Sequence, residues 1–401
     1  MKKHSNYYYF LILIILMSIL PLISTDIYLP AFPDVSHYFH ADFTQVQQTL
    51  GIYLFSIAIM QLIYGPLSDI YGRKKILLSG VVIYIIGTLG CLLSFSISQM
   101  LIGRLLQGLG ICAGIVISKA IISDTYDAKE SAKIYTTVFP FIGCSPAIAP
   151  VIGGYLTSMY SWQANFIFLL FLAVLLFIGS TRFLKETKKF DQPSSFSLTQ
   201  IFKNYGSLIT SRLFMGYTLV VCCAYGAWFS YISDSSFIFK TMGFESHQIG
   251  YFYVPLSVTY VITNLIGKRL IGKIKIDHLI LSGILILLSG SVLMVIFTQH
   301  PINNPLSIIV PMSIIAAGNG FLLPLGTSSG LSRNSKISGT ASGFLGFLQL
   351  GTAALCATLV GHFTNGSAFH LALFITGIGI VLLTSYIYLI VWPRKLDEIP
   401  T

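Results

Sequence analysis

Ionisable side chains interrupt long apolar stretches of this sequence, where a charge is costly. Asp26 is the only acidic or basic residue between positions 7 and 33, Arg104 and Lys119 share one apolar run, and Asp234 stands in another. A charged residue at the centre of a membrane helix costs about 2.5–3.5 kcal/mol on insertion scales, so it is expected to face a bundle interior and a partner. A carboxyl group there can exchange a proton. We therefore expect proton coupling at Asp26, Arg104 and Asp234.

Simpler interpretations of these four residues stay open. Arg104 begins its run and Lys119 lies near the other end, so both side chains can extend to the membrane surface. Asp26 and Asp234 can lie at hydrated helix ends. Gln107 follows Arg104 by three positions and so shares its helix face. The residues that we expect to bind substrate are Tyr28, Gln107, Lys119 and Tyr231.

Composition places the chain among polytopic membrane proteins. It has 401 residues, of which 54% are hydrophobic and 9% charged, against about 25% charged in ordinary soluble domains. Its mean hydropathy is +0.79. No polar stretch is long enough for a soluble catalytic, ATPase or sensing domain. We therefore expect a transporter, not an enzyme.

Metal, disulfide and nucleotide chemistry find no support in the sequence. The six cysteines lie in apolar runs without a C-x-x-C pair, and the eight histidines show no metal-ligand spacing. The segment 267–273 has the glycine–lysine spacing of a P-loop, but Ile274 stands where Ser or Thr must bind magnesium. We expect no metal and no cofactor, with the proton as coupling ion.

Apolar runs of membrane-spanning length predict an all-α fold of twelve transmembrane helices. The runs are 7–33, 45–66, 76–97, 99–122, 134–158, 163–184, 208–238, 248–269, 278–298, 304–326, 337–362 and 367–392. A polar stretch divides them into an N-terminal half (1–185), a linker (186–206) and a C-terminal half (207–401). The strings Ile76–Gly80 and Leu279–Gly283 begin equivalent spans 203 positions apart, which favours two pseudo-symmetric six-helix halves.

Charge distribution predicts the orientation. Of the 24 lysines and arginines, 21 fall in the tails and in alternate loops, and the remaining loops hold only Lys240. The positive-inside rule therefore places both termini in the cytoplasm. The net charge of +10 follows from the same rule, so we expect no nucleic-acid partner. The expected partners are a small-molecule substrate and the lipid bilayer, and we expect a monomer.

The loop between the second and third spans carries a spaced set of glycines and charges. Asp69 and Arg73 are four positions apart and can pair, or Asp69 can face the N-terminus of another helix. We expect this loop, with Asp124 at the end of the fourth span and Ser338–Gly339 at the start of the eleventh, to form an inner latch. The latch residues are Gly65, Asp69, Gly72, Arg73 and Asp124.

Three of these strings resemble the major facilitator superfamily. The loop resembles its Gly-x-Leu-Ala-Asp-Arg-x-Gly-Arg-Lys signature, with departures at Ser68 and Ile70. The fourth span resembles Arg-x-x-Gln-Gly-x-Gly. The fifth span resembles the Gly-Pro-x-x-Gly-Gly signature of proton antiporters, although Ala149 replaces the first glycine. The residues that carry this antiporter-type helix are Pro146, Pro150, Gly153 and Gly154.

The first span points to one branch of that superfamily. Residues 25–33 resemble the Thr-Asp-Met-Tyr-Leu-Pro-Ala-Leu-Pro string of the bicyclomycin/chloramphenicol-resistance (Bcr/CflA) drug:proton antiporters, with Ile27 and Phe32 as departures. That branch usually has a small neutral residue at the position of Asp234. The resemblance implies proton-driven export of hydrophobic or amphipathic small molecules across the inner membrane. A dedicated exporter of a metabolite or siderophore stays open, and a proton-coupled importer fits the antiporter-type string less well.

Overall fold

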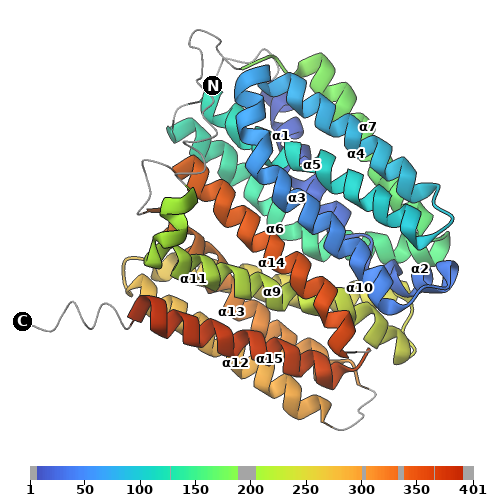
Figure 1. Cartoon of the computed structure of the whole chain (residues 1–401), viewed down its shortest axis with the longest axis vertical. Coiled ribbons are helices and arrows are strands. Elements are labelled where there is room, and N and C mark those ends of the chain that lie inside the picture. The colour runs from blue at the N-terminus through green and yellow to red at the C-terminus, as the bar shows by residue number, and fades with distance from the viewer. Residues whose placement is uncertain are drawn as a thin grey trace, which may run out of the picture. The chain divides into compact units, whose positions relative to one another are not determined.

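The computed structural model describes residues 7–126, 128–187, 205–299, 304–332, 338–364 and 366–391. Throughout these ranges the chain is helical, apart from connections and one isolated bridge between Ile271 and Ile274 (Figure 1). The elements are α1 (Tyr7–Asp26), η1 (Leu29–Ala31), α2 (Phe32–Phe39), α3 (Phe43–Tyr71), α4 (Arg73–Leu92), α5 (Ile97–Thr125), α6 (Ala128–Met159), α7 (Gln163–Phe183), α9 (Arg212–Thr241), α10 (Ser246–Phe252), α11 (Val254–Leu270), α12 (Ile276–Thr298), α13 (Leu306–Ser332), α14 (Ser338–Thr364), α15 (Ala368–Tyr386) and η3 (Ile387–Val391).

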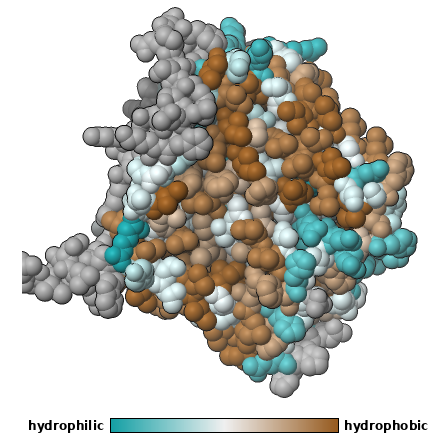
Figure 2. Space-filling view, viewed as in Figure 1, coloured by the Kyte–Doolittle hydropathy of each residue, from teal (hydrophilic) through white to brown (hydrophobic). Residues whose placement is uncertain are grey.

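The predicted membrane helices are confirmed. Eleven stretches of the described chain are long and apolar enough to cross a bilayer, with α1–α2 and α10–α11 each forming one of them. Helix α6, of 32 residues, covers the one remaining predicted run, 134–158. Apolar side chains dominate the visible surface of these helices (Figure 2). That surface suits contact with lipid, since a soluble protein rarely exposes so large an apolar area.

Contacts divide the chain into two compact units. The first comprises Met1–Phe196 together with Glu245–Tyr251, and the second comprises Ser197–Phe244 and Phe252–Thr401. Almost all of α10 therefore groups with the first unit, although the sequence-based division places this stretch in the C-terminal half. Most of the predicted linker, 186–206, lies outside the described residues.

Very close helix pairs occur in both units, and one pair in each has glycine on both helices at equivalent positions. In the first unit, a Cβ at Gly80 of α4 would lie 2.8 Å from the carbonyl oxygen of Gly110 of α5. In the second unit, a Cβ at Gly318 of α13 would lie 2.7 Å from the carbonyl oxygen of Gly283 of α12. Small residues allow membrane helices to approach this closely. Gly80 and Gly283 belong to the two strings that suggested the repeat.

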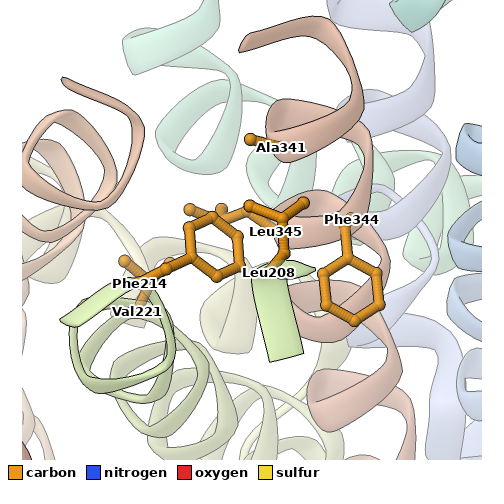
Figure 3. Close-up of a cluster of buried hydrophobic side chains, with 6 residues drawn as sticks. All are labelled: Leu208, Phe214, Val221, Ala341, Phe344 and Leu345. Atoms are coloured by element: carbon orange, nitrogen blue, oxygen red, sulfur yellow. The ribbon is translucent and has the colours of Figure 1, made fainter. Parts of the chain in front are cut away.

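An apolar cluster holds the beginning of the second unit together. The helical segment 205–210 contributes Leu208, which packs with side chains from α9 and α14 (Figure 3). The ring of Phe344 stacks on Tyr205, with centroids 5.2 Å apart, and on Phe214, at 6.3 Å. The buried members of the cluster are Leu208, Phe214, Val221, Ala341, Phe344 and Leu345. This packing fixes the entry of α9, which carries Tyr231 and Asp234.

Candidate functional site

Arg104 is the centre of a buried polar cluster in the first unit. Its side chain is fully buried within α5. Nη1 donates to Gln107 Oε1 at 2.9 Å and to the carbonyl oxygen of Ser24 at 3.2 Å, and Nε donates to the carbonyl oxygen of Thr49 at 3.4 Å. Nη2 has no hydrogen-bond partner among the described residues. The guanidinium group therefore joins α1 and α3 to α5, and the two N–H groups of Nη2 stay without a described acceptor.

Two tyrosine rings flank this guanidinium group. The Arg104 Cζ atom lies 4.1 Å from the ring centre of Tyr53 on α3 and 5.1 Å from that of Tyr28, which follows α1. The hydroxyl group of Tyr28 is 3.2 Å from Thr49 Oγ1, and that of Tyr53 donates to the carbonyl oxygen of Pro21 at 2.8 Å. Aromatic faces stabilise a cation most where water is excluded. The rings therefore help to offset the burial of the arginine charge.

Asp26 is the last residue of α1 and lies two positions after Ser24, whose carbonyl oxygen accepts from Arg104. Its exposed fraction is 5%. No ion pair within 4.0 Å among the described residues includes Asp26 or Arg104. The structure thus places the predicted acid and the predicted base near the same helix junction without pairing them.

Further polar side chains extend the cluster beyond those expected from the sequence. The hydroxyl groups of Ser24 and Tyr84 of α4 are 2.6 Å apart. Gln107 Nε2 donates to Thr88 Oγ1 at 2.9 Å. Tyr53, Tyr84 and Thr88 were not predicted, because hydroxyl groups are common in apolar spans. The available signal was the four-residue spacing within Thr49–Tyr53 and Tyr84–Thr88, which places each pair on one helix face.

The antiporter-type string of α6 lies between two other segments of the first unit. A Cβ at Gly153 would overlap the carbonyl oxygen of Ile27, directly after Asp26. On another side, a Cβ at Gly250 of α10 would lie 2.5 Å from the carbonyl oxygen of Pro150, and Gly154 abuts Ser246. Gly153 therefore permits α6 to contact the helix junction that carries Asp26. Pro146, one turn earlier in α6, is half-buried.

Polar contacts add to this packing of α10 on the first unit. Ser246 Oγ donates to Asp34 Oδ2 of α2 at 2.7 Å. The backbone N–H of His247 donates to Ser158 Oγ of α6 at 3.2 Å. The hydroxyl groups of Tyr155 and Tyr251 are 2.6 Å apart. The grouping of α10 with the first unit thus rests on specific contacts as well as close backbone approach.

The expected inner-latch residues come together around Arg73, the first residue of α4. Arg73 Nη2 lies 2.7 Å from Asp69 Oδ1, and Nε lies 2.9 Å from Asp124 Oδ2. Nη1 donates to Ser68 Oγ at 2.6 Å. Gly65 lies along α3, where a Cβ would be 4.0 Å from Val116 of α5. The start of α14, expected to meet Asp69, belongs to the second unit, and that contact stays a prediction.

Glu186 joins this cluster from a place that the sequence did not indicate. Its carboxylate accepts the backbone N–H of Arg73 at 2.9 Å and that of Lys74 at 3.1 Å. Gly72 adopts φ +92°, and a Cβ there would lie 2.5 Å from Glu186 Oε2. The first amides of a helix lack intrahelical partners, and its dipole favours an anion there. Glu186 therefore caps α4.

The remaining candidates lie apart from the Arg104 cluster. Lys119 is on the same helix as Arg104, is exposed, and makes no ion pair within the described ranges. Tyr231 and Asp234 of α9 are buried in the second unit, where the Tyr231 ring lies 6.1 Å from that of Tyr253. The Tyr253 hydroxyl group is 2.8 Å from Ser235 Oγ. No group of three or more potential metal ligands occurs in the described part of the chain.

The sequence is similar to known proteins over almost its whole length. The chain is 25% identical over 389 residues to multidrug resistance protein D of Escherichia coli K12, covering 96% of this chain and 97% of that protein. It is 26% identical to a bicyclomycin resistance protein homolog of Haemophilus influenzae, covering 92% of each chain. These similarities confirm the resemblance to the Bcr/CflA branch.

The fold agrees with this comparison. A bacterial homolog of the human lysosomal transporter Spinster, solved in an inward-facing and occupied conformation, superimposes with a TM-score of 0.78 at 15% identity, over 100% of this chain and 99% of that one. Residues 14–350 match the Major Facilitator Superfamily. The chain therefore belongs to the major facilitator superfamily.

Proposed function

We propose that this protein is a proton-coupled antiporter that exports hydrophobic or amphipathic small molecules, drugs among them, across the cytoplasmic membrane. The observation that carries the proposal is the buried acid Asp26, two positions after the Ser24 carbonyl group that accepts from Arg104, on a fold shared with transporters. The names of the relatives, multidrug resistance and bicyclomycin resistance, support the drug class. The protein has multiple membrane-spanning helices, and we place both its termini in the cytoplasm. It needs no cofactor besides the proton and works as a monomer.

The proton cycle follows from the environment of Asp26. The neutral acid is favoured in a water-poor site, while the carboxylate needs an added partner. Arg104 directs two of its nitrogens to carbonyl oxygens of α1 and α3 and to Gln107, so it does not neutralise Asp26 in this state. The unpartnered Nη2 is the donor that a deprotonated Asp26, or an acceptor group on the substrate, engages when the helices rearrange. Proton binding and substrate binding then compete.

Aromatic and aliphatic side chains set the breadth of substrates. Tyr28, Gln107 and Lys119 in the first unit and Tyr231 in the second supply the polar contacts. A mostly apolar site with a few polar groups accepts ligands of varied shape. Asp234 supplies a second acid, which favours substrates with a positive charge.

The experiment compares Asp26→Asn with Asp42→Asn in proteoliposomes under a proton gradient. Asn preserves size at both positions, and Asp42 is the exposed N-cap of α3, where Asn also caps. We expect Asp26→Asn to lose gradient-driven drug export by at least ten-fold, while Asp42→Asn retains wild-type rates. Circular dichroism and size-exclusion profiles verify folding.

Two results would contradict the proposal. If Asp26→Asn still exports drugs with an unchanged dependence on the gradient, Asp26 does not carry the proton, and Asp234→Asn is the next variant. If the wild-type protein exports no drug but releases a cellular metabolite from loaded vesicles, the dedicated exporter is correct and the drug class is wrong.

A further inference from the structure

The turn between α11 and α12 exposes an unusual combination of side chains. Every residue from 271 to 276, with the sequence Ile-Gly-Lys-Ile-Lys-Ile, is exposed. The exposed fractions of Ile271, Ile274 and Ile276 are 50%, 40% and 38%. Single exposed apolar residues are common on proteins, but three in six positions indicate a surface that meets another apolar phase.

The backbone of this turn is ordered by its own hydrogen bonds. The N–H of Ile271 donates to the carbonyl oxygen of Gly267 at 3.1 Å, and the N–H groups of Lys273 and Ile274 donate to that of Leu270 at 3.0 and 3.1 Å. The bridge between Ile271 and Ile274 brings these two residues side by side. Gly272, at φ +87°, makes the reversal possible. The exposed isoleucines therefore belong to a compact turn that extends the apolar side of α11.

Four cations surround these isoleucines without protein partners. Lys268, Arg269, Lys273 and Lys275 are all exposed, and none forms a side-chain hydrogen bond, ion pair or ring contact with a described residue. The nearest acid in the sequence is Asp277, and its Oδ1 atom accepts a hydrogen bond of 2.6 Å from the Tyr217 hydroxyl group. The turn thus carries a concentrated positive charge that no described residue neutralises.

The equivalent turn of the first unit uses its cations differently. Arg73 forms ion pairs with Asp69 and Asp124. Lys74 Nζ donates to the carbonyl oxygen of Thr181 at 2.8 Å, and Lys75 Nζ lies 5.9 Å from the ring centre of Tyr71. Both turns contain the basic residues that the positive-inside rule requires of a cytoplasmic loop. Of these two turns, the α11–α12 turn alone combines exposed isoleucines with cations that have no partner among the described residues, so orientation alone does not account for it.

We propose that the α11–α12 turn, residues 268–276, binds the headgroup of an anionic phospholipid. The phosphate groups contact Lys268, Arg269, Lys273 and Lys275, and the isoleucines insert at the boundary between the headgroups and the acyl chains. Basic residues next to a membrane helix attract anionic lipids in this way. The inference requires only that α11 and α12 cross the membrane, so it is independent of the exported molecule and of the proton site.

The isoleucines distinguish a lipid from a free phosphate compound. The segment has the glycine spacing of a phosphate-binding loop, and four cations suit any phosphate. A soluble phosphate gains nothing from Ile271, Ile274 and Ile276, whereas a lipid does. We therefore assign a lipid to this turn, and the experiment also measures the binding of a soluble phosphate compound.

The test uses the full-length protein and native mass spectrometry of lipid binding. Cardiolipin and phosphatidylglycerol are the probes, phosphatidylethanolamine is the zwitterionic comparison, and glycerol 1-phosphate is the soluble headgroup. The variant is Lys273→Gln with Lys275→Gln. Its matched control is Lys74→Gln with Lys75→Gln, which removes the same charge from the equivalent turn. A second variant, Ile271→Ser with Ile274→Ser, removes apolar contact and keeps every cation.

We expect the wild-type protein to bind cardiolipin in preference to phosphatidylethanolamine. Each basic residue contributes about a five-fold gain in affinity for an anionic membrane, so the Lys273/Lys275 variant binds roughly 30-fold more weakly. The control changes affinity by less than about three-fold. The isoleucine variant loses lipid affinity and keeps any weak affinity for glycerol 1-phosphate. If the double variant does not fold, Lys273→Gln and Lys275→Gln are measured separately. Each should lose about five-fold in lipid affinity.

Three results would overturn the proposal. Equal losses in the two lysine pairs would indicate a general charge effect. Glycerol 1-phosphate binding as tight as cardiolipin binding would indicate a plain anion site. An isoleucine variant with wild-type lipid affinity would show that the apolar residues have no part in binding.

Discussion

Arg104 shows how a membrane protein keeps a buried charge without a carboxylate partner. Its donors face the carbonyl oxygens of Ser24 and Thr49 and the side chain of Gln107, and its flat group lies by the rings of Tyr53 and Tyr28. A guanidinium group suits this arrangement because its donors point in fixed directions in one plane and its faces accept aromatic rings. Arg104 is therefore a structural connector as well as a charge.

Replacement of Arg104 by lysine tests this double role. Lysine keeps the charge but concentrates its donors at one nitrogen, so it cannot reach Ser24, Thr49 and Gln107 together. A hydrogen bond to a charged group contributes about 1.5–3 kcal/mol, so we expect gradient-driven transport to fall at least ten-fold. The control is Arg212→Lys, because Arg212 is exposed and, among the described residues, its side chain contacts Tyr388 alone. Near-normal transport by Arg104→Lys would show that charge alone matters.

At the residue scale, the sequence predicted the charges and the Asp69–Arg73 pair, but it missed most of the groups around Arg104. Asp26 and Arg104 were predictable because an acid or base in an apolar span is rare. Two of the acceptors of Arg104 are backbone carbonyl oxygens, which no residue type reveals. Tyr53 and Tyr84 went unpredicted because tyrosine is frequent in this chain, with 22 copies. Asp26 and Arg104 form no ion pair among the described residues. Their positions in the sequence could not predict this, because it depends on how α1 and α5 pack.

At the scale of elements, the start of α4 is the best-defined junction. Glu186, which follows α7, accepts the first two amides of α4 while Arg73 binds Asp69 and Asp124. The structure explains why glycine stands at position 72 of the loop signature. Any side chain there would collide with the Glu186 carboxylate. The turn between α3 and α4 is thus joined to the end of α5 and to the segment that follows α7.

Glu186→Ala should loosen this turn without unfolding the unit. An anion at an exposed helix N-terminus contributes about 0.3–1 kcal/mol, so amide exchange in the first turn of α4 should accelerate by up to about five-fold. Hydrogen–deuterium exchange of peptides covering 72–78 measures it, and Lys185→Ala is the neighbouring control. Unchanged exchange in Glu186→Ala would show that the carboxylate leaves α4 unaffected.

The helices themselves were predictable, and their grouping was not. Apolar length alone gave all twelve spans, since lipid requires the backbone to satisfy its own hydrogen bonds. The contact of α10 with α6 depends on Gly154 and Gly250, where backbone meets backbone. A hydropathy pattern contains no such information. The same holds for the Gly80–Gly110 and Gly283–Gly318 crossings, which are visible only once the helices are placed.

At the scale of the whole molecule, the two units share a plan and differ in their charges. Both have a close glycine crossing between equivalent helices, Gly80–Gly110 in the first unit and Gly283–Gly318 in the second. The first unit holds Asp26, Arg104 and Lys119 within its helices, whereas the second holds Asp234 as its buried acid. The two units therefore share their helix packing but not the ionisable residues within their helices.

Orientation in the membrane is the prediction that belongs to the whole chain. Since 21 of the 24 lysines and arginines fall on one side, both termini and the 186–206 linker should face the cytoplasm. Single cysteines report it on a Cys144→Ser background, because Cys144 is the exposed native cysteine of the described chain. In intact cells, a membrane-impermeant maleimide should label Phe95→Cys, an 82% exposed position between α4 and α5. Ser195→Cys should react only after the cells are opened, and its labelling in intact cells would reverse the topology.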